Sequence, residues 1–158
     1  KYMLDIAKIG SDYEMLMDFQ RGLNSNRPDE SIQLDELLDL YKFSYYENIS
    51  SDWIINKREH LERIYINCYK SVARMLYDAG RYLDCILVLD KVIKLDPYPE
   101  ELSSMFMKAC LGAGDIKSVV TCYDNFAKLI KEELDCDVSP ELQKVYDDII
   151  QKRSELRI

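Results

Sequence analysis

The 158-residue sequence contains one histidine, and this shortage limits the reactions that its side chains can support. His60 lies in a charged stretch, and without a second histidine no Ser/His/Asp or Cys/His catalytic set can be assembled elsewhere. The sequence also lacks a Gly-rich phosphate-binding loop. Adjacent acids such as Asp147 and Asp148 point about 100° apart on a helix, which is typical of solvated surface charge. We therefore expect neither enzymatic activity nor a bound cofactor.

Long hydrophobic runs, frequent turn residues and an excess of positive charge are also missing. No apolar run approaches the roughly 18 residues of a membrane-spanning helix, and no signal peptide is visible, so we expect a cytoplasmic protein with no membrane partner. The 5 glycines and 4 prolines leave few interruptions, which favours long helices. A formal net charge of −8 argues against unaided binding to nucleic acid, because that affinity depends mainly on Lys and Arg. The length is sufficient for one domain with its own core.

The cysteines follow no pattern that is typical of a metal site or a disulfide framework. Their number, 5, is odd, and no CxxC motif is present. A zinc site would need close-spaced ligands, which one histidine does not complete. Four of the five lie on apolar faces of predicted helices, so we expect buried, reduced thiols and no bound metal. They are Cys68, Cys85, Cys110, Cys122 and Cys136.

The sequence does contain a duplication. Ala79-Gly80 recurs 34 residues later as Ala113-Gly114, and each pair separates two amphipathic runs. This is the period of the tetratricopeptide repeat (TPR), a helical hairpin that becomes stable by stacking on its neighbours. We expect the repeats to begin at Ile66 and Glu100, and an ordinary antiparallel helical bundle is the alternative. The predicted packing positions are Tyr69, Val72, Ala73, Leu76, Cys85, Leu89, Val92 and Pro97 in the first repeat and, with a looser match, Ser103, Phe106, Met107, Cys110, Val119, Tyr123, Phe126 and Lys131 in the second.

Hydrophobic spacing and helix-start signals predict about seven helices. Asp115 is the expected N-cap of the sixth helix, and Ser139-Pro140-Glu141 starts the last, which covers the open end of the stack. Residues 1–10 alternate like a short strand that has no partner here, and residues 43–51 form a connecting loop. The predicted fold is all-α, a TPR-like right-handed stack of antiparallel helix hairpins with a short N-terminal strand remnant. The predicted helices cover residues 11–23, about 29–41, 52–78, 82–95, 99–112, 115–134 and about 140–153.

The order of these features resembles the bacterial transcriptional activation domain of SARP-type transcriptional activators. The resemblance extends from about Asp12 to Ile150, and its most specific part is the run from Glu132-Glu133-Leu134 to Ser139-Pro140-Glu141-Leu142 after a pair of repeats. Cys85 and Cys110 depart from it, since they stand where that family usually has alanine or a similar residue. The other matching residues are Leu40-Tyr41, Trp53, Lys57-Arg58-Glu59, Tyr65, Gly80-Arg81-Tyr82, Leu95-Asp96-Pro97, Glu100, Met107, Gly114 and Tyr123.

The resemblance implies a position within a larger regulator. In that family the domain follows a winged-helix DNA-binding domain, so residues 1–10 are expected to be a remnant of that domain and residues 11–158 to be the TPR-like activation domain. Because the first residue is Lys rather than Met, we expect the chain to be part of a longer protein. The implied partners are its own winged-helix domain, RNA polymerase or a second protomer, and DNA is contacted only through the missing domain.

The repeat register also predicts a partner-binding face. In TPR folds the inner groove is lined by first-helix positions that face away from the second helix. Several cations on one face of an acidic protein create a local positive potential that suits an acidic segment or a terminal carboxylate. The alternative is that these residues are ordinary exposed positions on a helix. The predicted face consists of Asn67, Lys70, Arg74, Tyr77 and Lys108.

Two other functions remain open from the sequence. One is a stand-alone TPR adaptor that binds an acidic peptide and is unrelated to transcription. The other is a sensory helical domain whose groove binds a small effector, which the 12 tyrosines would permit.

Overall fold

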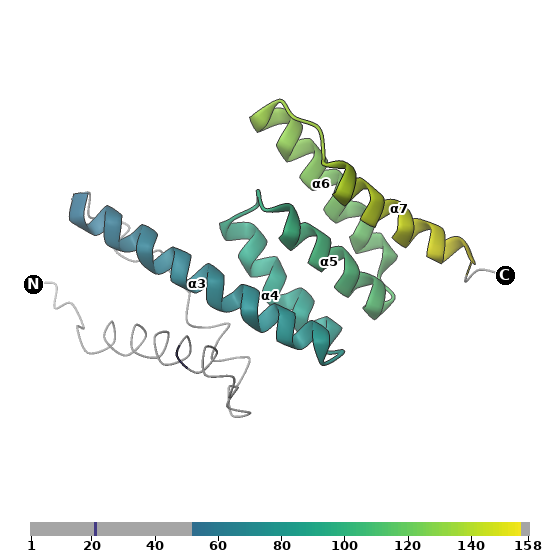
Figure 1. Cartoon of the computed structure of the whole chain (residues 1–158), viewed down its shortest axis with the longest axis horizontal. Coiled ribbons are helices and arrows are strands. Elements are labelled where there is room, and N and C mark those ends of the chain that lie inside the picture. The colour runs from purple at the N-terminus through teal and green to yellow at the C-terminus, as the bar shows by residue number, and fades with distance from the viewer. Residues whose placement is uncertain (1–20, 22–51, 156–158) are drawn as a thin grey trace, which may run out of the picture. The chain divides into compact units, whose positions relative to one another are not determined.

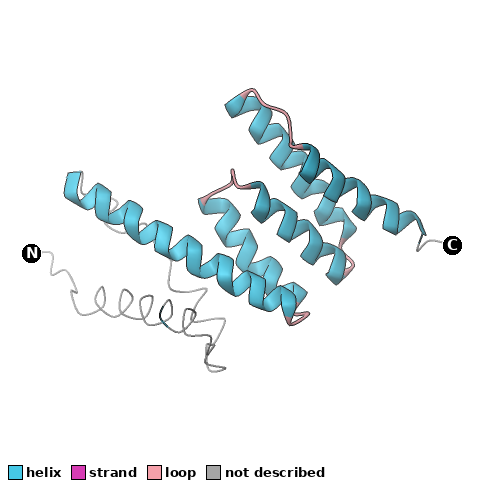
Figure 2. Cartoon of the chain, viewed as in Figure 1, coloured by secondary structure: helices cyan, strands magenta, loops and turns pink. Residues whose placement is uncertain are grey.

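All regular elements in the described part of the chain are α-helices (Figure 2). The computed structural model describes residue 21 and residues 52–155. This confirms the all-α prediction for these residues, and each predicted helix limit lies within two residues of the observed one. The helices, labelled in Figure 1, are α3 (Asp52–Asp78), α4 (Tyr82–Leu95), α5 (Glu100–Ala113), α6 (Ile116–Leu134) and α7 (Pro140–Glu155).

Several predictions for the N-terminal third fall outside the described residues. They are the strand at residues 1–10, the helix at about 29–41 and the loop at 43–51. Arg21 is the described residue of the helix predicted at 11–23, and it is helical. The count of seven helices and the strand remnant therefore stay predictions.

Contacts divide the chain into two units, residues 1–71 and 72–158, so that α3 begins in the first unit and ends in the second. In the first unit, α3 buries Leu61, Ile64 and Cys68 at helical spacing. The rings of Tyr65 and Tyr69 lie with their centroids 4.2 Å apart at an interplanar angle of 31°. These buried residues recur at the spacing of one helix face.

The turns at Gly80 and Gly114 have the same hydrogen bonds, 34 residues apart. Gly80 N–H donates to Tyr77 O at 3.0 Å, and the next N–H, that of Arg81, donates to Leu76 O at 2.8 Å. After the second turn, Gly114 N–H bonds Leu111 O at 3.0 Å, and Asp115 N–H bonds Cys110 O at 2.8 Å. Both glycines have positive φ, 72° and 79°, as this helix-ending motif requires. The duplication seen in the sequence is therefore a duplication of backbone structure.

Side chains cap the N-termini of the last two helices, as predicted. A carboxylate oxygen of Asp115 accepts a hydrogen bond from Ser118 N–H at 3.1 Å, which caps the N-terminus of α6. At α7 the hydroxyl oxygen of Ser139 accepts from Leu142 N–H at 3.1 Å. Pro140 is the first residue of α7, where the missing N–H of proline has no consequence. Both predicted N-caps are therefore confirmed.

Helix α5 is the central element of the second unit. It contacts α4, α6 and α7, and α7 also contacts α6 (Figure 1). A buried cluster joins α5, α6 and α7, and consists of Met107, Cys110, Val119, Phe126, Ile130, Leu142 and Ile149. Because α7 contributes two residues to this cluster, it covers apolar surface of the preceding hairpin, as predicted for the closing helix.

Burial follows the predicted repeat positions closely in the first repeat and less closely in the second. All helical packing positions of the first repeat, from Tyr69 to Val92, are buried. In the second repeat Phe106 and Tyr123 are half-buried and Lys131 is exposed. Met107 takes the position of the small residue Ala73 and is fully buried. The larger side chain is therefore accommodated inside the core.

Three of the four cysteines predicted to lie on apolar helix faces are buried, and the fourth is half-buried. Cys68, Cys85 and Cys110 are buried, Cys122 is half-buried and Cys136 is exposed. Burial raises the pKa of the Cys85 thiol to about 11, and burial is also the main cause that raises the pKa of Cys110 to about 12. The thiol of Cys85 donates to the carbonyl oxygen of Ala73 at 3.2 Å and so links the end of α3 to α4. These thiols are therefore protonated packing groups at neutral pH.

Candidate functional site

The predicted partner-binding face is distributed over both units. Asn67 and Lys70 belong to the first unit, where Asn67 is exposed and Lys70 half-exposed. Arg74, Tyr77 and Lys108 belong to the second unit, where Arg74 and Lys108 are exposed and Tyr77 is half-exposed. All five side chains therefore reach solvent to some degree, as a binding face requires. Its role in binding stays a prediction.

An acidic residue that the sequence analysis did not include lies on this face. The guanidinium of Arg74 lies 2.7 Å from a carboxylate oxygen of Glu101, in the first turn of α5. Both side chains are largely exposed, so the pair adds little stability. It does reduce the positive potential around Arg74. Lys70 and Lys108 form no ion pair with another described residue, so they carry the remaining positive charge.

Tyr77 contributes to a tight contact at one end of the second unit. Its ring meets that of Tyr82 edge to face, with centroids 5.6 Å apart. The Tyr82 ring in turn covers Gly112 of α5 so closely that a Cβ at this glycine would lie 2.7 Å from the ring. Burial is the main cause that raises the pKa of Tyr77. On this face Tyr77 therefore packs against a neighbouring aromatic ring.

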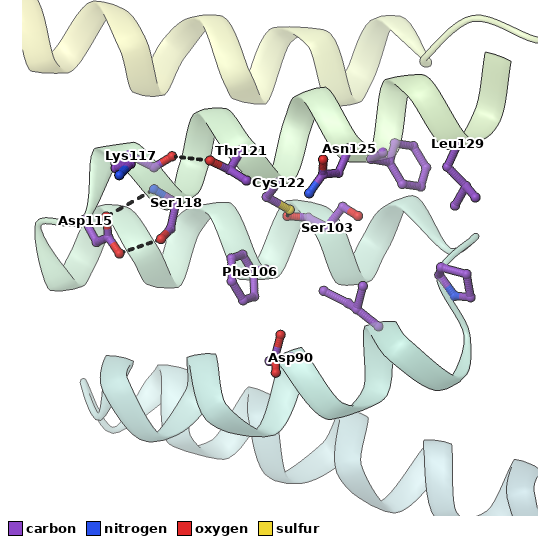
Figure 3. Close-up of a pocket in the computed structure, with 13 residues that line it drawn as sticks. Asp90, Ser103, Phe106, Asp115, Lys117, Ser118, Thr121, Cys122, Asn125 and Leu129 are labelled. Atoms are coloured by element: carbon purple, nitrogen blue, oxygen red, sulfur yellow. Dashed lines mark hydrogen bonds between the residues drawn. The ribbon is translucent and has the colours of Figure 1, made fainter. Parts of the chain in front are cut away.

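A groove between α4 and α6, over α5, was not predicted from the sequence (Figure 3). Its volume is about 620 Å³. It lies on the side of α5 away from Lys108, since Phe106, which lines it, precedes Lys108 by about 200° of helix rotation. The lining residues are Asp90, Ile93, Pro97, Ser103, Phe106, Asp115, Lys117, Ser118, Thr121, Cys122, Asn125, Phe126 and Leu129.

Hydrogen bonds are present at both ends of this groove. At one end the hydroxyl of Tyr98, in the loop between α4 and α5, donates to the carboxylate of Glu133 near the end of α6. This bond raises the pKa of the Tyr98 hydroxyl. At the other end the hydroxyl of Ser118 donates to Asp115 at 2.6 Å, and the bonds from Ser118 lower the pKa of the Asp115 carboxyl. The α4–α5 loop is thereby linked to the end of α6, and the start of α6 is capped.

The first turn of α7 is attached to α5 through a carboxylate. Glu100 accepts hydrogen bonds from the backbone N–H of Ser139, at 3.1 Å, and from the hydroxyl of the same residue. Further along, the rings of Tyr123 on α6 and Tyr146 on α7 stack with centroids 4.1 Å apart. The hydroxyl of Tyr123 also donates to the side chain of Gln143. Helix α7 is therefore held by polar and aromatic contacts as well as by the core.

The described residues contain no group of three or more His, Cys, Asp or Glu side chains arranged to hold a metal ion. Likewise, within residues 21 and 52–155, no helix combines the length and the apolar content that crossing a bilayer requires.

Comparison with known proteins identifies the family. The family model described as the bacterial transcriptional activator domain matches residues 15–150, well over half of the chain. The chain belongs to this family. No curated protein and no solved structure matches it significantly. The family match confirms the resemblance drawn from the sequence motifs, and it extends over all of α3, α4, α5 and α6 and most of α7.

A bacterial transcriptional activator domain is a regulatory domain of transcription rather than a member of an enzyme family. This assigns the α3–α7 region to transcriptional activation in general terms.

Proposed function

We propose that this bacterial transcriptional activator domain is the protein-interaction and oligomerisation module of a SARP-type regulator. Residues 11–158 form this module, and residues 1–10 are the end of a winged-helix domain that grips DNA. The module packs on that winged helix and contacts RNA polymerase or a second protomer. The observation that carries the proposal is the family match over residues 15–150.

We propose that the module is a TPR-like right-handed stack. Three features support this assignment. Two helix-ending turns with the same hydrogen bonds occur at Gly80 and Gly114, at the spacing of the repeat. The predicted repeat positions supply much of the buried core. Helix α7 covers the last hairpin as terminal repeats require.

The partner contacts the face formed by Asn67, Lys70, Arg74, Tyr77 and Lys108. Support comes from the exposure of these side chains and from two lysines without an ion pair among the described residues. Because Glu101 neutralises Arg74, the electrostatic attraction of an acidic partner depends mainly on Lys70 and Lys108. This weakens the alternative of a stand-alone adaptor that recognises acidic peptides by a continuous cationic groove.

Tethering the chain to DNA tests the proposal. The full chain is fused to a sequence-specific DNA-binding protein, and transcription is measured from a reporter promoter in bacteria. We expect increased transcription, and a decrease when Lys70→Glu and Lys108→Glu are combined. A matched control combines Lys144→Glu with Lys152→Glu, which makes the same charge change at exposed positions of α7.

Sedimentation velocity of the same proteins separates the two partner classes. A dimer that the Lys70/Lys108 variant disrupts assigns the face to a second protomer. A monomer that still activates the reporter assigns it to the transcription machinery. Reporter activity equal to that of the DNA-binding protein alone, together with a monomer at every concentration, would contradict the proposal.

A further inference from the structure

Helix α4 carries two leucines that are open to solvent. Leu83 is 71% exposed and Leu87 is 54% exposed. They are four residues apart, so they are neighbours on one face of the helix. Apolar side chains scattered singly over a surface need no explanation, whereas a grouped pair suggests a contact surface. We infer that this face of α4 binds the same face of a second copy of the chain, with the two helices antiparallel. The inference rests on the proposed oligomerisation and assigns it to residues outside the partner-binding face.

The second repeat has polar residues where the first has these leucines. A shift of 34 residues takes Leu83 to Lys117 and Leu87 to Thr121, and both of these residues of α6 are exposed. The repeat structure therefore does not require leucine at either position. The other exposed residues at this spacing are an aspartate and a lysine in both helices, namely Asp90 and Lys94 in α4 and Asp124 and Lys128 in α6.

The charges beside the leucines favour a second copy as the occupant. A cation, Arg81, precedes the leucines along the chain, and an anion, Asp90, follows them. Leu83 and Leu87 are centred on Cys85, and the two charged residues are centred only half a residue further on. A two-fold axis at this point sets each Leu83 against Leu87 of the second copy. The same axis sets each Arg81 against Asp90 of the second copy, whereas a parallel pair would oppose like charges.

Both charged side chains have capacity for this additional contact. Each is more than half exposed. Within the chain, Arg81 contacts one carboxylate oxygen of Asp84 through Nε and Nη2, both at 2.7 Å, and Asp90 pairs with Lys94 at 2.6 Å. A guanidinium has five N–H donors and a carboxylate has two acceptor oxygens, so neither group is saturated by its partner within the chain. The contact between copies therefore adds ion pairs without breaking those inside each copy.

The size of the contact predicts a weak dimer. Helix α4 has 14 residues, which corresponds to a length of about 21 Å. One such helix from each copy buries less area than a standard stable interface. We therefore expect a dissociation constant on the order of 100 µM. Two copies held on one promoter would reach an effective concentration of about 1 mM, at which such a dimer forms.

Sedimentation equilibrium of the full chain tests for this dimer. The concentration should run from roughly tenfold below to tenfold above the expected dissociation constant. We expect the mass to rise from 18.6 kDa toward that of a dimer. Leu83→Lys combined with Leu87→Thr introduces the residues of the second repeat and should keep the chain monomeric. Leu134→Lys is the matched control, because Leu134 at the end of α6 is also 54% exposed, and it should leave the dimer unchanged.

A charge exchange tests the antiparallel arrangement. Arg81→Glu or Asp90→Lys alone opposes like charges and should weaken the dimer by at least about threefold. The two changes together restore each ion pair in reverse and should return the affinity to within about twofold of the unchanged chain. Damage inside one copy, through Asp84 or Lys94, would add in the double variant rather than cancel. Asp124→Lys makes the same charge change at the equivalent position of α6 and should have no effect.

Three results would overturn the inference. They are a monomer at every concentration, a dimer that persists when both leucines are replaced, and a charge exchange that does not restore the dimer. A monomer that still activates the tethered reporter would overturn this inference and leave the proposed function in place. A dimer formed through α4 that leaves the reporter silent would support the inference and contradict the proposed role in activation.

Discussion

The first and second repeats, residues 66–97 and 100–131, turn at glycines of the same conformation, yet their packing positions meet different surroundings. In the first repeat these positions are buried along the helices. In the second, Phe106 lines the groove and Tyr123 stacks on Tyr146 of α7. Lys131 lies 3.5 Å from Asp135 and from Asp137 in the loop before α7. The looser match of the second repeat is therefore concentrated where it meets a groove or the closing helix.

The two repeats also begin their second helices differently. Arg81, before α4, offers no side-chain cap and instead pairs with Asp84 at 2.7 Å. Asp115, before α6, caps the helix through Ser118. The backbone of the turn is thus common to both repeats, whereas the side chain that follows it is particular to each. The two repeats therefore share the backbone path of the turn but differ in the side chain that starts the second helix.

Exchanging the equivalent residues Ala73 and Met107 should give the largest effects. Met107→Ala leaves a cavity in the α5–α6–α7 cluster and should lower the free energy of unfolding by about 2–5 kcal/mol. Ala73→Met places a long side chain at a fully buried alanine and should cost about 1–3 kcal/mol. Urea denaturation followed by circular dichroism measures both. If Ala73→Met leaves the free energy of unfolding unchanged, the first repeat is not as tightly packed as its burial indicates.

The contact of Tyr82 with Gly112 should distinguish the repeats next. Gly112→Ala should destabilise the chain by about 1–3 kcal/mol, because the added methyl meets the tyrosine ring. In a Tyr82→Ala background the same change should stabilise by up to about 1 kcal/mol through helix propensity. Asp78→Ala, at the equivalent exposed position of the first repeat, is the control and should produce no loss. The same destabilisation in both Tyr82 backgrounds would rule out the ring as the cause.

The two helix-ending glycines should respond equally. Alanine at Gly80 or Gly114 meets no atom within 4 Å, so the only cost is positive φ, about 1–2 kcal/mol at either site. Thermal unfolding of the two single variants provides the comparison. A difference larger than about 0.5 kcal/mol would show that the turns, although alike in hydrogen bonding, are not equivalent in energy.

The stack of Tyr123 on Tyr146 should have the smallest effect. A double-mutant cycle with Tyr123→Leu and Tyr146→Leu should give a coupling of about 0.5–1.5 kcal/mol, since both rings keep an apolar substitute. Chemical denaturation of the four proteins measures this coupling. Additive effects of the two changes would mean that the rings share a surface without interacting.

Local signals in the sequence were sufficient to predict the helices of residues 52–155. Gly80 and Gly114 end helices because they adopt positive φ, and Asp115 and Ser139 begin them through short-range hydrogen bonds. The buried side of each helix followed from the spacing of apolar residues, which is why the burial of Cys85 and Cys110 was foreseen. Each of these properties depends on residues within one or two helical turns.

The groove and the Arg74–Glu101 pair depend instead on how separate helices pack. Ser103 and Asn125 come from different helices, and nothing in their own neighbourhoods indicates that both line one groove. Arg74 and Glu101 are likewise far apart in the sequence, so a helical register gives no sign of their contact. A register predicts which way a side chain points, and the identity of its neighbour requires the tertiary structure.

The central position of α5 has a consequence for the dynamics of the second unit. Helix α5 contacts α4, α6 and α7, so the loss of one of these contacts leaves the other two in place. We therefore expect the backbone amides of α5 to exchange hydrogen with solvent more slowly than those of the terminal helix α7, whose main contacts among the described helices are with α5 and α6. In deuterated water, α5 should be the last helix of the unit to lose its protons.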